Sequence, residues 1–85
     1  MRILLLSHVH EKLAARKITK SRVEETISNP NSVVSGKRGR KVSQRKYFDN
    51  EKKKEYLLRV VFEERGDTKI IITAYRTSKI EKYQK

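Results

Sequence analysis

Two stretches of alternating apolar and polar residues constrain the fold of this chain most strongly. They run from Glu55 to Glu64 and from Lys69 to Arg76, and the turn sequence Arg65-Gly66-Asp67-Thr68 separates them. Successive side chains of a strand point to opposite faces of a sheet, so the pattern predicts an antiparallel hairpin. In the simplest register, one face carries Tyr56, Leu58, Val60, Phe62, Ile70, Ile72 and Ala74, and the other carries Leu57, Arg59, Val61, Ile71, Thr73 and Tyr75. A functional site is expected on the second face, where polar and apolar side chains mix.

The residues before this hairpin predict two helices and further strands. Ser21 with Glu24 three residues later is a capping-box pattern and indicates where the second helix begins. The expected elements are a strand at 2–6, helices at 8–17 and 21–28, a short strand at 32–35, a strand at 42–48, the hairpin, and a helical turn at 78–83. We therefore expect a single α+β domain over residues 1–85, with an N-terminal strand and two helices packed on an antiparallel sheet of three to four strands.

The net charge favours a polyanionic partner. Lys and Arg number 22 against 10 Asp and Glu, which gives a formal charge of +12 on 85 residues. Such a field attracts nucleic acid, and a solvated basic surface without a specific partner is the alternative. The longest apolar run is Ile3-Leu4-Leu5-Leu6, too short for a membrane span or a signal peptide, and the chain has no Cys. A cytoplasmic protein without a membrane partner is therefore expected.

Three basic residues are spaced to form one stripe on the first expected helix. His8, Lys12 and Arg16 stand at positions i, i+4 and i+8, which lie on the same side of a helix. Such a stripe can bind phosphate, and a histidine titrates near neutral pH and can act as a general acid or base. The alternative is an ordinary solvated face of an amphipathic helix.

The hairpin offers a second group of candidate site residues. Arg59, Thr73 and Tyr75 fall on the same face in the expected register. A guanidinium and two hydroxyls can hold a phosphate and stabilise the charge that develops in phosphoryl transfer. Ordinary cross-strand pairing is the alternative, because Thr and Tyr are common in strands.

Two further basic segments are candidates for nucleic-acid binding. The first is a glycine-containing loop followed by two aromatic residues, a combination that suits single-stranded RNA. The second is the C-terminal segment, for which a charged tail without a specific role is the alternative. Together these segments contribute Lys37, Arg38, Arg40, Lys41, Arg45 and Lys46 from the first, and Arg76, Lys79, Lys82 and Tyr83 from the second. The two histidines lack acidic neighbours suited to a metal site, so we expect neither a metal nor a cofactor.

Two segments of this chain resemble small toxin-like proteins of the RelE/ParE superfamily. They are His8-Val9-His10-Glu11-Lys12-Leu13-Ala14-Ala15-Arg16-Lys17-Ile18-Thr19 and Ile70-Ile71-Ile72-Thr73-Ala74-Tyr75-Arg76-Thr77-Ser78-Lys79-Ile80-Glu81-Lys82-Tyr83. The first is similar to the His-x3-Arg-x3-Arg-x-Ile-Thr pattern of a BrnT-like group, with Lys12 where Arg is usual. The resemblance implies helices followed by a curved antiparallel sheet, the fold shared by barnase, EndoU, colicin and RelE.

The resemblance also implies an activity and a partner. It implies a toxin of a type II toxin–antitoxin system that cleaves RNA without a metal, by attack of the ribose 2′-OH on the adjacent phosphate. An acidic antitoxin protein would be its partner, and the RNA could be ribosome-bound mRNA. On matching positions, it implies His8 as acid or base, Arg16 and Arg59 as phosphate ligands, Thr73 and Tyr75 as site hydroxyls, and Tyr83 as a stacking or acid group. The alternatives are a non-catalytic nucleic-acid-binding module and an inhibitor of a protein target such as gyrase, and a homodimer stays open.

Overall fold

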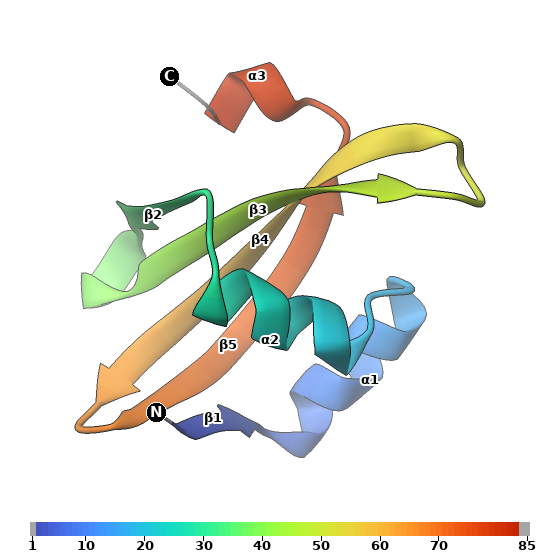
Figure 1. Ribbon diagram of the computed structural model, residues 1–85. Helices are drawn as coiled ribbons and strands as arrows, with labels where there is room; N and C mark the ends of the chain where they lie inside the picture. Colours follow the sequence, from blue (N-terminus) through green and yellow to red (C-terminus); the bar gives the residue numbers. More distant parts are fainter. Residues whose placement is uncertain (1, 84–85) are drawn as a thin grey trace.

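A five-stranded mixed sheet organises residues 2–83, which are the part of the chain that the computed structural model describes (Figure 1). Its strands lie side by side in the order β1-β5-β4-β3-β2. The elements are β1 (Arg2–Leu5), α1 (Ser7–Ala15), α2 (Lys20–Ser28), β2 (Ser32–Ser35), the 3₁₀ turn η1 (Lys37–Gly39), β3 (Lys41–Asp49), β4 (Lys54–Arg65), β5 (Thr68–Thr77) and α3 (Ile80–Tyr83). The α+β class is as expected from the sequence.

The sheet differs from the expected one in strand number and direction. We expected three to four antiparallel strands, but β1 joins the sheet as a fifth strand and runs parallel to β5. Its pairing extends from Arg2 opposite Thr68 to Leu5 opposite Ile71. Without β1, the backbone N–H and C=O groups along this part of β5 would lack partners, so the N-terminal strand completes hydrogen bonding that the hairpin leaves open.

The hairpin forms as predicted, with one irregularity that changes which side chains are buried. Arg59 pairs with Tyr75 and Val60 with Ala74, but the register shifts between Val61 and Phe62. Because β5 carries one extra residue at this bulge, Ile71 turns into the core and Ile72 does not. The expected register grouped Ile72 with Phe62 and placed Ile71 on the opposite face. It was wrong at this point, since alternation alone does not reveal a bulge.

Helices α1 and α2 cover one face of the sheet and bury the core between them and the strands. Val9 and Leu13 of α1 are buried, together with residues of α2 and of the hairpin. The core cluster consists of Val9, Leu13, Ile18, Val23, Ile27, Leu58, Val60, Phe62, Ile71 and Ala74. We call this side of the sheet the helix face and the opposite side the open face.

The two helices meet at a tight joint. Lys17 has a left-handed backbone (φ 56°), and the N–H of Ile18 donates to the carbonyl of Leu13 across 2.9 Å. This hydrogen bond ends α1 and brings the two apolar side chains, Leu13 and Ile18, into the core together. The side chain of Thr19 then caps α2 by accepting from the N–H of Arg22 at 3.2 Å. The helix thus begins before Ser21, and the capping box predicted there does not form.

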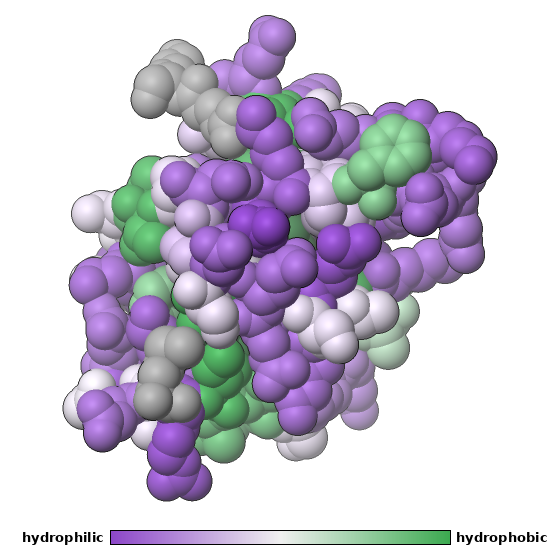
Figure 2. Space-filling model, viewed as in Figure 1, coloured by the Kyte–Doolittle hydropathy of each residue, from purple (hydrophilic) through white to green (hydrophobic). Residues whose placement is uncertain are grey.

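The surface is largely hydrophilic. Figure 2 shows polar residues over most of the side on which α2 lies in front of the sheet, with apolar atoms at the edge occupied by β2. Val33 and Val34 of β2 are 49% and 37% exposed. Among residues 2–83, no helix has both the length and the apolar character needed to cross a bilayer.

Candidate nucleic-acid interface

Arg59 lies at the centre of the open face and is fixed by residues from three other elements. Its Nε donates to Oε1 of Gln44 on β3 at 2.7 Å, and its Nη1 donates to the hydroxyl of Tyr75 on β5. Its guanidinium carbon lies 4.1 Å from the centre of the Tyr83 ring on α3, a cation–π distance. The guanidinium is therefore preorganised, with its position set by the sheet and by the C-terminal helix.

Gln44 was not recognised in the sequence as part of the site. Its side chain is buried, and its Nε2 donates to Oγ of Ser32 at 2.9 Å while its oxygen accepts from Arg59. A buried amide needs such partners, because an unpaired polar group in the interior is costly. In the sequence, Gln44 stands between Ser43 and Arg45 in an expected strand. A polar residue with polar neighbours on both sides gives no indication of whether its side chain is buried or exposed.

A cavity of about 330 Å³ opens beside Arg59 and Tyr75. We call it the open-face pocket, and its lining residues are Ser35, Gly36, Lys37, Arg40, Val42, Arg59, Val61 and Tyr75. Three of them are cations, and none of these described lining residues is a carboxylate. Arg40 also pairs with Glu63 at 3.2 Å. The pocket combines two groups that the sequence suggested separately, the basic loop and the Arg59–Tyr75 pair.

The basic loop is shaped to place its cations at the rim of this pocket. The N–H of Gly36 donates to the carbonyl of Arg40 at 2.7 Å, which closes the loop between β2 and β3. A Cβ at Gly36 would lie 3.3 Å from that same carbonyl oxygen, tighter than most such contacts. Arg38 and Gly39 both adopt left-handed backbone conformations (φ 59° and 73°). The loop is thus a defined turn that holds Lys37 and Arg40 beside Arg59.

The chemistry of the open-face pocket suits a phosphate. Guanidinium and ammonium groups form charge-assisted hydrogen bonds with phosphate oxygens. The Tyr75 oxygen accepts from Arg59, so its own O–H is left to donate to a substrate atom. A pocket lined by cations and one phenol can therefore bind a phosphodiester and supply a proton donor to it.

The predicted stripe on α1 lies away from this pocket. His8 and Lys12 are exposed on α1, which packs on the helix face, and Arg16 is exposed directly after the end of this helix. Arg16 reaches the edge of β5, where its Nη1 donates to Oγ1 of Thr73 at 3.2 Å and to the carbonyl of Ala74 at 2.7 Å. The structure thus brings Thr73 to Arg16 and not to Arg59, and it does not bring His8 to the open-face pocket.

Two other predicted RNA-binding arginines are held within the fold. Arg45 donates from Nε to Glu25 at 3.2 Å and from Nη1 to the carbonyl of Asn29 at 2.7 Å. Arg76 donates from Nη1 to the Tyr47 hydroxyl at 3.1 Å and also to the Asp49 carboxylate. These contacts tie α2 to β3, and β5 to the end of β3, so both arginines have a structural role in this conformation.

Charge and hydrogen bonding around Arg76 shift the pKa of both partners. The Tyr47 hydroxyl, followed by Asp49, raises the pKa of Arg76 above its ordinary value despite opposition from burial. The backbone N–H of Lys52, followed by the side chain of Arg76, lowers the pKa of Asp49. Hydrogen bonds to the ionised form have this effect, so the pair remains charged over the whole neutral range.

The remaining predicted cations are distributed around the sheet. Lys41 pairs with Glu64 at 2.6 Å, and Arg38 is exposed in η1. Lys46, Lys79 and Lys82 line a second cavity between the strands and α3. Within residues 2–83, no group of three or more His, Asp and Glu side chains is arranged to hold a metal ion.

Comparison with known proteins gave one match. Residues 5–76 match the model of a family described as Domain of unknown function (DUF4258). No curated protein and no solved structure matched the chain. The matched range extends from Leu5, the last residue of β1, to Arg76 in β5, so it includes the open-face pocket and excludes α3 with Tyr83.

Proposed function

This chain belongs to the DUF4258 family, and we propose that it is a toxin-type endoribonuclease that binds the RNA backbone in the open-face pocket. The observation that carries the proposal is the convergence of Lys37, Arg40 and Arg59 with the Tyr75 hydroxyl around one cavity. The net charge of +12 supports an RNA partner, because it attracts polyanions to the whole surface.

The proposed reaction uses the substrate's own 2′-OH as the nucleophile. Its oxygen attacks the adjacent phosphorus, the bond from phosphorus to the 5′-oxygen breaks, and a 2′,3′-cyclic phosphate and a 5′-OH remain. The cations of the pocket would stabilise the negative charge that builds up on the phosphate oxygens. Tyr75 would donate its proton to the departing 5′-oxygen, and the proton of the 2′-OH would pass to water.

The test is Tyr75→Phe, which keeps the ring and removes the hydroxyl. We expect purified wild-type protein to cleave RNA in EDTA and the variant to be slower by about 10²-fold or more, the usual contribution of a general acid. His8→Ala is the matched comparison, since His8 lies on the other side of the sheet, and it should cleave at the wild-type rate. If the Tyr75→Phe variant were as active as the wild type, the proposed role of Tyr75 as proton donor would be wrong.

A toxin role adds a cellular expectation. Inducible expression in a bacterial host should arrest growth and fragment total RNA, and Tyr75→Phe should relieve both effects while folded protein accumulates. A small acidic protein is the proposed antitoxin, because opposite charge speeds association with a basic partner. Growth arrest with intact RNA would contradict the nuclease and favour action on a protein target.

A non-catalytic RNA-binding module is the second candidate function. It is favoured by the position of His8, because the one side-chain type best suited to proton transfer near neutral pH is remote from the open-face pocket. This candidate expects salt-sensitive RNA binding by the wild type and no cleavage under any condition.

A further inference from the structure

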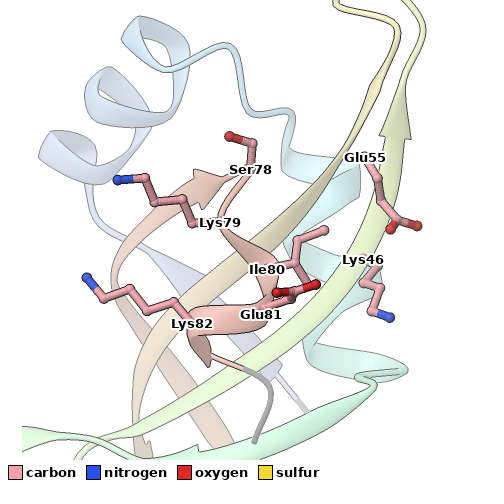
Figure 3. A pocket seen from close by; sticks show the side chains of 7 residues that line it. All are labelled: Lys46, Glu55, Ser78, Lys79, Ile80, Glu81 and Lys82. Atoms are coloured by element: carbon pink, nitrogen blue, oxygen red, sulfur yellow. The ribbon is translucent and has the colours of Figure 1, made fainter.

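A second cavity lies on the open face, under the short C-terminal helix α3. It has a volume of about 610 Å³ and is lined by Lys46, Glu55, Ser78, Lys79, Ile80, Glu81 and Lys82. We call it the α3 pocket. Figure 3 shows Ile80 and Glu81 extending from α3 toward the side formed by Lys46 and Glu55, whereas Lys79 and Lys82 extend away from that side.

The composition of this pocket differs from that of the open-face pocket. It contains two carboxylates, Glu55 and Glu81, and neither forms an ion pair with another residue of the described range 2–83, although three lysines line the same cavity. Two carboxylates among three lysines make this lining less basic than that of the open-face pocket, whose charged lining residues are all cations. The two carboxylates accept hydrogen bonds from N–H groups, and Ile80 offers an apolar surface between them.

The α3 pocket is adjacent to the open-face pocket. Glu55 stands four residues before Arg59 on the same face of β4, a separation of about 13 Å along the strand. Leu57 lies between them on that face and is fully buried. Tyr83 of α3 also stacks on Arg59 at 4.1 Å, so one helix contributes to both sites. A single strand bound at Arg59 can therefore continue toward α3.

We propose that the α3 pocket is a nucleobase subsite that selects bases carrying an exocyclic amino group. Glu55 and Glu81 accept hydrogen bonds from the amino group, Lys46 donates to a ring nitrogen or carbonyl, and Ile80 packs against the flat base. Carboxylate recognition of the cytosine amino group has this chemistry. Uracil presents a carbonyl oxygen where cytosine presents its amino group, and a carboxylate oxygen repels it.

The inference deepens the proposed RNA binding and rests on it, so the experiment separates the two. The probes are 2′-O-methylated octamers of cytidine and of uridine, which cannot be cleaved through the 2′-OH. Their affinities are measured by fluorescence anisotropy for the wild type and for the double variant Glu55→Ala with Glu81→Ala. The matched control is Glu11→Ala with Glu24→Ala, which removes two exposed carboxylates from α1 and α2.

We expect the wild type and the control to bind the cytidine octamer at least about fivefold more tightly than the uridine octamer. The Glu55 and Glu81 variant should bind both octamers equally, and its affinity for uridine should rise because two negative charges are gone. Equal affinities in the wild type, or a cytidine preference that survives in the variant, would overturn the base subsite and leave RNA binding intact. Failure of the wild type to bind either octamer would overturn the proposed function and the subsite with it.

Discussion

Asp49 is the residue whose ionisation contributes most clearly to holding two elements together. Its carboxylate accepts from the backbone N–H groups of Glu51 and Lys52 and from Arg76, and these partners lower its pKa. The side chains of Arg76 and Asp49 are only 15% and 16% exposed. The interaction therefore closes the β3–β4 turn and joins it to the end of β5.

A pH-dependent loss of stability follows from this lowered pKa. The folded state favours ionised Asp49, so the stabilisation is complete above the ordinary pKa of 3.8 and is lost as the pH falls through the lowered value. We expect Asp49→Asn to reduce the urea midpoint of unfolding at pH 7, and the difference from the wild type to shrink below about pH 4. Asp67→Asn, in the β4–β5 turn, serves as the charge-matched control. A difference that is the same at pH 7 and at about pH 2.5 would contradict this account.

Residue types alone predicted part of the candidate site. Arg59 and Tyr75 were predicted to share a face from alternation, and the structure joins them by a hydrogen bond. Thr73 was predicted beside them, but it contacts Arg16 at the strand edge. The register pairs Thr73 with Val61 as alternation predicted, and the contact with Arg16 depends on where the end of α1 lies against β5, which no local pattern in the sequence marks. Gln44 was missed because its burial depends on which strands flank it.

At the scale of elements, the beginning of α2 offers a direct test of the helix cap. Thr19→Ala removes the side-chain acceptor for the N–H of Arg22 and should lower the free energy of unfolding by about 1 kcal/mol. Ser21→Ala changes the residue that the capping-box pattern favoured, and it should alter stability by less than about 0.5 kcal/mol. Both positions are exposed, so the two substitutions leave packing alone. Urea unfolding of both variants measures the effect, and a larger loss for Ser21→Ala would place the cap at Ser21.

The helices and strands themselves were largely predictable, and their ends were not. Apolar spacing located α1 and α2 because Val9, Leu13, Val23 and Ile27 form the buried face of each helix. The ends depend on backbone angles, such as the left-handed Lys17 that terminates α1. A lysine in that conformation gives no sequence signal of the kind that glycine gives.

At the scale of the whole molecule, the +12 charge and the open-face pocket make different predictions about how RNA affinity depends on salt concentration. The affinity of a protein for single-stranded nucleic acid falls as salt is added. In a plot of log K against log salt concentration, each neutralised phosphate contributes about −0.7 to the slope. Lys37→Ala should therefore reduce the magnitude of the slope by about 0.7. Lys52→Ala removes the same charge from the exposed β3–β4 turn and should change the slope much less. Equal changes in both variants would indicate a diffuse electrostatic attraction without a defined phosphate site.

The sequence allowed the fold class to be predicted, but the predicted sheet topology was incomplete. Composition and order of the elements predicted an α+β domain with helices on one face. The parallel pairing of β1 with β5 could not be predicted, since it joins residues at opposite ends of the chain. Hydrophobic periodicity reports which residues are buried, but it does not report which edge of a sheet accepts a distant strand.

That pairing also determines when the protein can fold during its synthesis. Arg2 through Leu5 emerge from the ribosome before the rest of the domain, yet their partners, Thr68 through Ile71, are made after most of it. The apolar faces of α1 and α2 likewise wait for β4 and β5, which supply Leu58, Phe62 and Ala74 to the core. Contacts between such distant segments form slowly. The nascent chain therefore cannot assemble its core, or the sheet face that carries Arg59, until β5 has been translated.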